Sequence, residues 1–182
     1  MDPRRWRRHG LGLLGLLLAA LAVTAALGAP LLAPHDPVTA DFAQGLKPPG
    51  TPGHPWGTDQ LGRDLFSRVL YGARIALFIG LCTVLLTAVA GGLVGLLAGF
   101  FEGWAGAVLM RLADVQLTFP TILIALMVDG VTRALLSGEA HDRLAVAVIV
   151  FSIGISNWVH YARTVRASTL VEKRKEYVQA AR

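Results

Sequence analysis

A short stretch between two hydrophobic segments crowds together seven side chains of the types that carry acid–base or nucleophilic chemistry: His54, Asp59, Arg63, Asp64, Ser67, Arg68 and Tyr71. It reads HPWGTDQLGRDLFSRVLYGAR and covers residues 54–74. A hydrolase would need a hydroxyl beside a base that a third group orients. Ser67 has no histidine within helical reach, and His54 precedes a proline in a predicted loop. The spacing therefore disfavours a nucleophilic site, and a membrane-anchored enzyme that uses residues 34–74 is kept only as the alternative function.

Metal and cofactor sites are not indicated by the residue spacing either. His35 and His54 lack the ligand spacing typical of zinc sites. Cys82 is the only cysteine and lies in an apolar run, which excludes a cysteine metal cluster and an internal disulfide. A GxxxxGK[ST] phosphate loop does not occur in the sequence. We therefore expect no catalytic residue, no metal ligand and no cofactor in this chain.

The same stretch has the pattern of a short amphipathic helix that starts near Thr58, where Thr58 or Asp59 can cap it. Its opposite charges recur at four-residue spacing, as Asp59 with Arg63 and Asp64 with Arg68, so they can pair along the helix. The apolar positions follow the same period, at Leu61, Leu65 and Val69. We expect this helix to lie along a membrane surface with its apolar side down.

Composition places these side chains in a membrane protein. Of the 182 residues, 54% are hydrophobic and only 16% are charged, and the mean hydropathy is +0.55. About a quarter of the residues of soluble domains are charged. Residues 10–33 and 75–101 contain no charged residue, and each run exceeds the roughly 20 apolar residues that a membrane-crossing helix needs. A buried core helix of a soluble protein is the alternative, and two such runs in one small chain argue against it.

We expect an all-α polytopic bundle with about four membrane helices. These are expected near residues 10–32, 75–101, 112–136 and 144–161. A cleaved signal peptide is the alternative for the first helix, but its apolar run exceeds the usual length of roughly 7–15 residues. The chain then divides into a basic tail with the first helix, an external loop with the surface helix, three further helices and a basic end segment. The bounds of these parts are 1–33, 34–74, 75–161 and 162–182.

The basic residues cluster beside the apolar runs, as in RRWRR at 4–8 and EKRKE at 172–176. Although the pI is near 10, this placement is typical of membrane orientation rather than of a nucleic-acid-binding stripe. With four helices and an internal amino terminus, eleven of the 17 Lys and Arg residues lie inside and six outside. We therefore expect both termini inside and no nucleic-acid partner. The end segment can bind anionic membrane lipid or an internal protein partner.

Two patterns within the predicted helices indicate contacts between helices. Gly91, Gly95 and Gly99 repeat every four residues, so they form one smooth face for a neighbouring helix, although glycine richness alone is the alternative. Asp129 and Arg133 are also four apart and can pair on one face of the third helix. Charges at membrane depth tend to face a bundle interior or an aqueous path. This pair is therefore either a structural ion pair near the interface or part of a solute path.

Four blocks of the sequence have a characteristic order and spacing: HPWGTDQLGRDLFSRVLYGAR, FPTILIALM, NWVHYARTVRASTL and EKRKEYVQAAR. Together they resemble the second permease subunit of dipeptide/oligopeptide ABC importers, and the resemblance covers almost the whole chain. The most specific block contains Gly57, Thr58, Asp59, Gly62, Arg63, Asp64, Ser67 and Arg68. The resemblance implies a type I importer permease with about six membrane helices in the parent protein.

The resemblance also implies a function and a set of partners. The protein would be a multi-pass component of the cell (inner) membrane, with a cytoplasmic amino terminus, that moves peptides or related small solutes by alternating access. The implied partners are a homologous second permease in a heterodimer, two cytoplasmic ATPase subunits that hydrolyse ATP, and an extracytoplasmic solute-binding protein. The binding protein largely chooses the solute, so a dipeptide, an oligopeptide, a nickel complex and glutathione all stay open.

In that family a cytoplasmic loop carries the EAA motif, whose short helix fits a groove on the ATPase. The matching residues here are Glu176, Tyr177, Gln179, Ala180, Ala181 and Arg182, with Gln179 in place of the nominal glutamate. The glycine of the motif and its Ile-x-Leu-Pro part would lie beyond Arg182, as would the last two membrane helices. The resemblance therefore implies that the chain is an amino-terminal fragment or an incomplete gene model.

Overall fold

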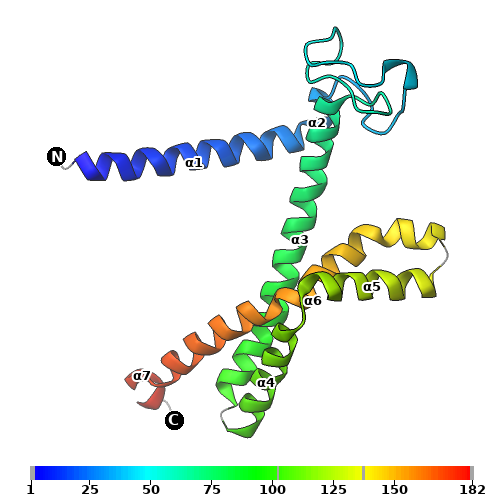
Figure 1. The fold of residues 1–182 in the computed structure, drawn as a ribbon. Helices are drawn as coiled ribbons and strands as arrows, with labels where there is room; N and C mark the ends of the chain where they lie inside the picture. The colour runs from blue at the N-terminus through cyan, green and yellow to red at the C-terminus, as the bar shows by residue number, and fades with distance from the viewer. Residues whose placement is uncertain (1–2, 102, 137, 181–182) are drawn as a thin grey trace. The chain divides into compact units, whose positions relative to one another are not determined.

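The computed structural model describes residues 3–101, 103–136 and 138–180, and these form helices and loops (Figure 1). In chain order they are α1 (Pro3–Leu27), α2 (Ala29–Leu32), the 3-10 helix η1 (Phe42–Gln44), α3 (Leu65–Phe100), α4 (Trp104–Thr118), α5 (Thr121–Leu135), α6 (Gly138–Lys173) and α7 (Glu176–Ala180). Within these described residues, β-structure is limited to two isolated bridges. The predicted all-α class is confirmed.

Three described helices are long and apolar enough to cross a membrane: α1 over Gly10–Leu27, α3 and α6. A fourth crossing is present if α4 and α5 are counted as one broken span. The 36 residues of α3 correspond to about 54 Å of helix. A bilayer core is only about 30 Å thick. The helix therefore extends well outside the hydrocarbon layer, and it begins at Leu65 rather than at residue 75.

The structure differs from the predicted continuous helix over residues 112–136. α4 ends at Thr118, and α5 begins at Thr121 after a bend of 88°. Pro120, between them, has an extended conformation with φ −58° and ψ 130°. Proline has no amide hydrogen to donate, and it disfavours the helical conformation in the preceding residue. Phe119 is accordingly extended, with ψ 127°, so the helix is broken rather than slightly bent.

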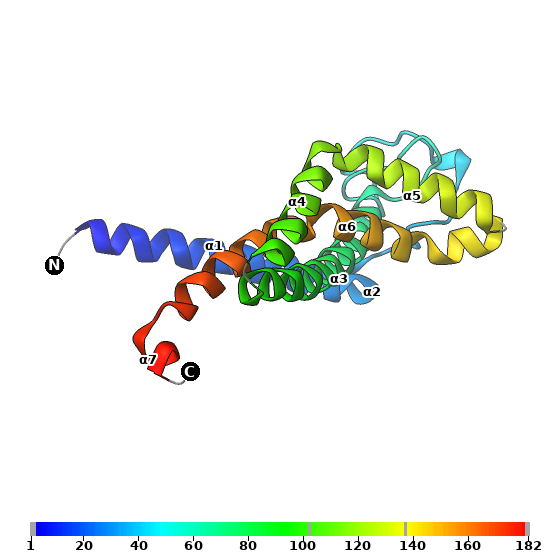
Figure 2. The ribbon, with the colours of Figure 1, turned by 90° about the horizontal axis from the view of Figure 1, so that it is seen from below.

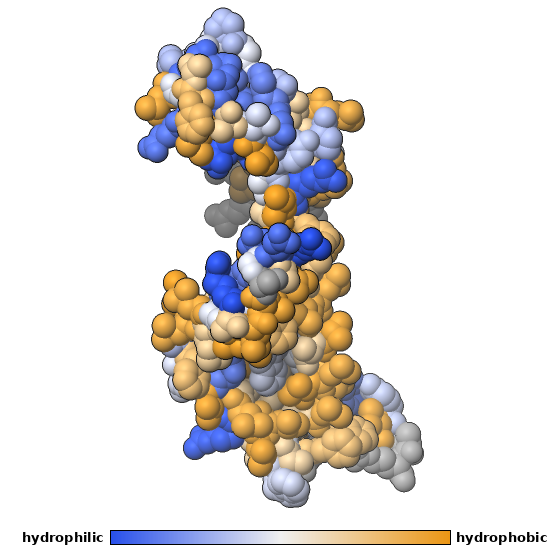
Figure 3. All heavy atoms as spheres, turned by 90° about the vertical axis from the view of Figure 1, so that its right-hand side faces the viewer, coloured by the Kyte–Doolittle hydropathy of each residue, from blue (hydrophilic) through white to orange (hydrophobic). Residues whose placement is uncertain are grey.

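The chain divides into two compact units, Met1–Phe78 and Ile79–Arg182. In the first unit, residues 33–68 form a folded loop structure that we call the collar, whose surface mixes hydrophilic residues with exposed apolar ones (Figure 3). Two glycines with positive φ close its turns, Gly57 at 77° and Gly62 at 76°. A Cβ on Gly62 would lie 1.7 Å from the carbonyl oxygen of Asp41, so only glycine fits there.

The prediction of an amphipathic helix that starts near Thr58 is wrong. Residues 58–64 form turns, and the first helical residue is Leu65. The cap explains the starting point, because Oδ2 of Asp64 accepts the backbone N–H of Ser67 at 2.8 Å, as an N-cap side chain does in the first helical turn. The charged residues before the cap therefore belong to a loop and not to a helix face.

In the second unit, the glycine face of α3 lies against α6. A Cβ on Gly91 would be 2.3 Å from the carbonyl oxygen of Trp158, and a Cβ on Gly95 would be 2.4 Å from that of Ala162. These distances leave no room for a side chain, so the two backbones approach closely. α5 packs along the amino-terminal half of α6 (Figure 2). The buried apolar cluster of the unit consists of Ala98, Met110, Ala113, Val159 and Ala162.

Candidate functional site

Asp64 is the centre of the polar network in the collar, and it is only 2% exposed. Its Oδ1 lies 3.0 Å from Nδ1 of His54, and its Oδ2 accepts the Ser67 hydroxyl at 2.7 Å. Burial acts to raise the pKa of Asp64, but hydrogen bonds from the hydroxyl and backbone N–H of Ser67 and from His54 outweigh it, so the pKa is lowered. The folded collar therefore holds Asp64 as a carboxylate.

The order of these groups does not fit nucleophilic catalysis. A serine nucleophile needs a base on its hydroxyl. Ser67 instead donates to a carboxylate, and its oxygen also accepts the backbone N–H of His35 at 3.2 Å. Asp64 thus lies between Ser67 and His54, and Ser67 is fully buried. The network supports a structural role for Ser67 and gives no support to the alternative of an enzyme site in residues 34–74.

Asp59 organises a second polar cluster, with two arginines. Its Oδ2 accepts the Nε–H of Arg63 at 2.8 Å and also pairs with Nη1 of Arg68, while Oδ1 accepts the backbone N–H of Arg63 at 2.9 Å. Burial acts to raise the pKa of Asp59, but the hydrogen bonds from Arg63 outweigh it, so the pKa is lowered. The expected pairing of Asp64 with Arg68 is wrong, because Arg68 contacts Asp59 instead.

The remaining residues of the most specific sequence block close the loop of the collar. Oγ1 of Thr58 accepts the backbone N–H of Lys47 at 2.9 Å and donates to the carbonyl oxygen of Gln44. The carbonyl oxygen of Gly57 accepts the backbone N–H of Leu65 at 3.1 Å. All eight residues of the block therefore lie in the collar, where they cap, close or cross-link its turns.

Sequence reasoning missed two members of the network. Oε1 of Gln44 lies 2.8 Å from Nε2 of His54, and the ring of His35 stacks on the ring of His54 with centroids 4.6 Å apart. These three residues come from separate turns of an irregular loop, so no helical or strand period relates them. The only signal in the sequence was the presence of polar side chains in a proline-rich segment, which does not specify contacts.

The carboxyl-terminal end of α6 is tied to the end of α3. Nζ of Lys173, the last residue of α6, donates to the carbonyl oxygen of Phe100 at 2.8 Å and to that of Gly99 at 3.4 Å. The last carbonyl groups of a helix have no partner within the helix, and a cation there satisfies them. Gly99 also lies against Thr169, since a Cβ on Gly99 would be 2.7 Å from the Thr169 Cβ.

α7 follows α6 after a short turn, which the side chain of Glu172 stabilises. Nζ of Lys175 lies 2.6 Å from Oε1 of Glu172, and the hydroxyl of Tyr177 donates to Oε2 at 2.8 Å. The ring of Tyr177 remains 64% exposed. Of the predicted coupling residues, α7 contains Glu176, Tyr177, Gln179 and Ala180, while Ala181 and Arg182 lie outside the described residues.

Asp129 and Arg133 are paired on α5, with the Arg133 Nε 2.9 Å from the Asp129 Oδ2. The buried side chain of His141, on α6, adds a contact that the sequence did not indicate, with Nε2 3.3 Å from the Asp129 Oδ1. Asp129 also lines a groove of about 290 Å³ between the two helices. The contact between Asp129 and His141 therefore ties α5 to α6.

The helices of the second unit present a largely apolar exterior (Figure 3). Exposed large side chains occur along α3 and α5, including Leu81, Leu93, Leu126 and Met127. Soluble monomers rarely expose continuous apolar surface of this kind. Lipid or neighbouring helices must therefore cover these faces.

Comparison with known families shows the kind of protein to which these apolar helices belong. Residues 91–182, half of the chain, match the family described as binding-protein-dependent transport system inner membrane component. The chain belongs to this family. Residues 4–49 match a second family, the N-terminal TM domain of oligopeptide transport permease C. The assignment to this family of inner membrane components agrees with the helices that are long and apolar enough to cross a membrane.

Relatives of this permease-family chain carry names from peptide and glutathione transport. The glutathione transport system permease protein GsiD of Pectobacterium atrosepticum is 37% identical over 98% of this chain and 56% of its own length. The di/tripeptide transport system permease protein DppC of Pseudomonas aeruginosa is 39% identical over 96% of this chain and 56% of its own length. The oligopeptide transport system permease protein OppC of Bacillus subtilis is 33% identical over 97% and 54%. The chain thus spans about half the length of these relatives, and the predicted family resemblance is confirmed.

Proposed function

We propose that this chain is part of a transmembrane permease subunit of an ATP-driven importer for peptides or related small solutes. The observation that carries the proposal is the family match over residues 91–182, which include α4 to α7. The names of the relatives, which refer to glutathione, di/tripeptide and oligopeptide transport, support the class of solute. The helices of the chain form part of the translocation path, and ATP is hydrolysed by separate subunits.

The proposed subunit lies in the inner membrane with its amino terminus in the cytoplasm. Basic residues cluster at 4–8, before the apolar part of α1, and at 173–175, where α6 ends. Short segments rich in Lys and Arg stay preferentially on the cytoplasmic side. With α4 and α5 counted as one broken span, four crossings bring both basic clusters to the same side. The collar is then extracytoplasmic, and α7 is cytoplasmic.

In this arrangement α7 is the element that contacts the ATPase subunits. Its exposed Tyr177 is bonded to Glu172 of α6, and Lys173 of α6 is bonded to Phe100 of α3. A displacement of α7 would therefore move the ends of α6 and α3 together. The close glycine contact between α3 and α6 leaves these helices little freedom to slide, so the movement would pass into the membrane as a rigid-body shift.

Three kinds of partner complete the proposed importer. A homologous second permease forms a heterodimer with this subunit and covers part of its apolar exterior, and membrane lipid covers the rest. Two cytoplasmic ABC ATPase subunits bind at α7 and at the residues that follow it. An extracytoplasmic solute-binding protein delivers the solute to the side that carries the collar. The family description itself refers to a binding-protein-dependent system, which supports this last partner.

The test uses the full-length gene product that contains this chain, co-expressed with the neighbouring genes and reconstituted into proteoliposomes. Tyr177→Ala should reduce solute uptake and solute-stimulated ATP hydrolysis about ten-fold, because it removes an exposed aromatic side chain from the docking surface. Tyr177→Phe is the matched comparison, since it keeps the exposed ring and removes only the hydroxyl that bonds Glu172. ATPase subunits should still co-purify with it, and its uptake should fall less than that of Tyr177→Ala. The proposal fails if no ATPase subunit co-purifies, or if Tyr177→Ala transports as well as the wild type.

A further inference from the structure

The ring of His54 lies between two hydrogen-bond acceptors. Nδ1 is 3.0 Å from Oδ1 of Asp64, and Nε2 is 2.8 Å from Oε1 of Gln44. The orientation of the Gln44 amide is fixed, because its Nε2 donates to Asp41 at 2.7 Å and its Oε1 accepts Nζ of Lys47 at 3.1 Å. Nε2 of His54 must therefore carry the hydrogen that it donates to Gln44.

This assignment leaves Nδ1 of a neutral His54 with a lone pair that points at the carboxylate of Asp64. Two acceptors at 3.0 Å repel each other unless a cation lies between them. Both residues are buried, His54 at 5% exposure and Asp64 at 2%, so bulk water does not screen the repulsion. The geometry therefore favours a cation between Nδ1 of His54 and Oδ1 of Asp64.

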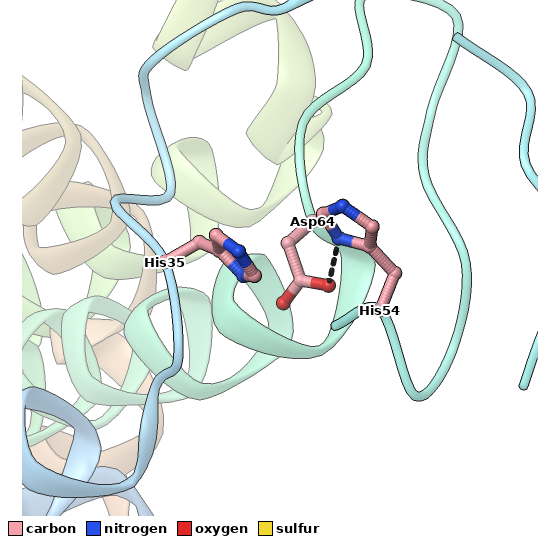
Figure 4. A group of neighbouring side chains, drawn as sticks. All are labelled: His35, His54 and Asp64. Carbon is pink, nitrogen blue, oxygen red and sulfur yellow. Dashed lines mark hydrogen bonds and ion pairs between the residues drawn. The ribbon is translucent and has the colours of Figure 1, made fainter. Parts of the chain in front are cut away.

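A third ligand group is in place beside this pair. The ring of His35 stacks on that of His54 at an angle of 22°, and one potential ligand atom from each of His35, His54 and Asp64 lies within 4.8 Å of the others (Figure 4). The ligand atoms of a tetrahedral zinc ion are about 3.3 Å apart, given bonds of about 2.0–2.2 Å. Nδ1 of His54 and Oδ1 of Asp64 are already close to that spacing at 3.0 Å. The exposed ring of His35 would turn out of its stack on His54 to complete the set.

The surroundings of the three groups match those of a metal site. Metal-bound histidines donate their other ring N–H to an oxygen, as His54 does to Gln44, and metal-bound carboxylates are themselves hydrogen-bonded, as Asp64 is by Ser67. A cavity of about 250 Å³ adjoins the group and gives a water molecule access as a fourth ligand. Two further carboxyl side chains, those of Asp36 and Asp41, line the same cavity and add negative charge.

We propose that His35, His54 and Asp64 bind a Zn²⁺ ion in the collar, with water as the fourth ligand. Two imidazoles, one carboxylate and a water molecule form a donor set that zinc accepts. The ion takes the place of a second proton on His54, and it fastens the segment that follows α2 to the start of α3. No spacing in the sequence indicates this site, because the three ligands come from separate turns of an irregular loop.

The test uses the untagged full-length protein that contains this chain, purified in detergent and stripped of metal with EDTA. Zinc binding is measured by competition with a chromogenic chelator, and Co²⁺ is used as a spectroscopic probe of the ligands. The wild type should bind one high-affinity Zn²⁺ per chain, and zinc should raise its thermal stability. The Co²⁺ complex should show visible absorption bands typical of four-coordinate nitrogen and oxygen ligation.

Two variants separate this site from zinc bound elsewhere. His35→Ala should weaken zinc binding at least about ten-fold. Its metal-free stability should change little, because the ring is exposed and makes only a stacking contact with His54, while the backbone N–H that bonds Ser67 remains. Gln44→Met should also weaken binding about ten-fold, through the lost partner of His54. His160→Ala is the matched control, since His160 is an exposed histidine on α6, and it should bind like the wild type.

Two results would overturn the proposal. If the stripped wild-type protein takes up no stoichiometric zinc, a proton alone bridges His54 and Asp64. If His35→Ala binds zinc as tightly as the wild type, the ion lies at another place. Neither result bears on transport, because the site is argued from collar residues and not from the proposed function.

Discussion

The hydroxyl of Ser67 donates a 2.7 Å hydrogen bond to Oδ2 of Asp64, the same oxygen that accepts the Ser67 backbone N–H at 2.8 Å. One carboxylate oxygen thus both caps α3 and fixes the serine. The serine oxygen in turn accepts the backbone N–H of His35 and so holds the far end of the loop. This arrangement makes Ser67 a fastening point between the first turn of α3 and a segment 32 residues earlier in the chain.

Ser67→Ala should loosen the collar. It removes a hydrogen bond to a buried charge and leaves the N–H of His35 without its acceptor, which together cost about 2 kcal/mol. Amide hydrogen exchange in the first turn of α3 should become roughly 30-fold faster. Ser168→Ala, at an exposed position of α6, is the control and should leave exchange in that turn unchanged. Equal protection in both variants would contradict the role assigned to Ser67.

Gly62→Ala should prevent the collar from closing. The residue has a φ of 76°, and its Cβ would lie 1.7 Å from the carbonyl oxygen of Asp41, so backbone strain and overlap combine. We expect a loss of at least about 2 kcal/mol of collar stability, seen as rapid cleavage in limited proteolysis. Gly72→Ala, in α3 with open space around it, should be neutral or stabilising by up to about 1 kcal/mol.

Gly95→Ala should separate α3 from α6. Its Cβ would lie 2.4 Å from the carbonyl oxygen of Ala162, and backbone cannot yield as a flexible side chain can. Overpacking of this kind costs about 1–3 kcal/mol, so the thermal unfolding temperature of the detergent-solubilised protein should fall. Gly92→Ala adds the same methyl group to open space on the same helix and should not lower it. Equal unfolding temperatures for the two variants would show that the glycine face is not a packing face.

Acid should weaken the cluster around Asp59. The pKa of Asp59 is lowered in the folded chain, so its contribution to stability is present above the unfolded value, about 3.9, and is lost as pH falls through the lower folded value. The resonance of fluorotryptophan at Trp56, which lies edge-on to Phe66 in the collar, reports the transition. In Asp59→Asn this part of the pH dependence should disappear. An identical pH profile in both proteins would refute the assignment.

Lys173→Met should uncouple α7 from α3. It removes the hydrogen bonds to the carbonyl oxygens of Phe100 and Gly99 but keeps an apolar chain of similar length. In the reconstituted full-length importer, uptake should fall more than ATP hydrolysis does. Lys175→Met is the control, because it breaks only an exposed pair with Glu172, and such pairs contribute less than about 1 kcal/mol. A parallel loss in both variants would indicate a general effect of charge.

The α4–α5 break shows where local sequence signals mislead. The apolar run before and after Pro120 has the length of a single crossing, and a proline near the start of a helix is often tolerated. Whether these residues form one helix or two depends on the direction of the chain after Phe119. The packing of α5 on α6 sets that direction. The contact between Asp129 and His141 has the same origin, because it joins two helices across a turn.

The helical class, the membrane character and the family of this protein can be predicted from its amino-acid sequence. Those properties depend on the length of uncharged runs and on local residue blocks, which need no knowledge of distant contacts. The fold was needed to show that Asp64 binds His54 and Ser67 rather than Arg68, and that α6 packs on the glycine face of α3. The physical reason is that loop contacts follow from turn geometry, here set by prolines and by glycines with positive φ, and such contacts have no period along the chain.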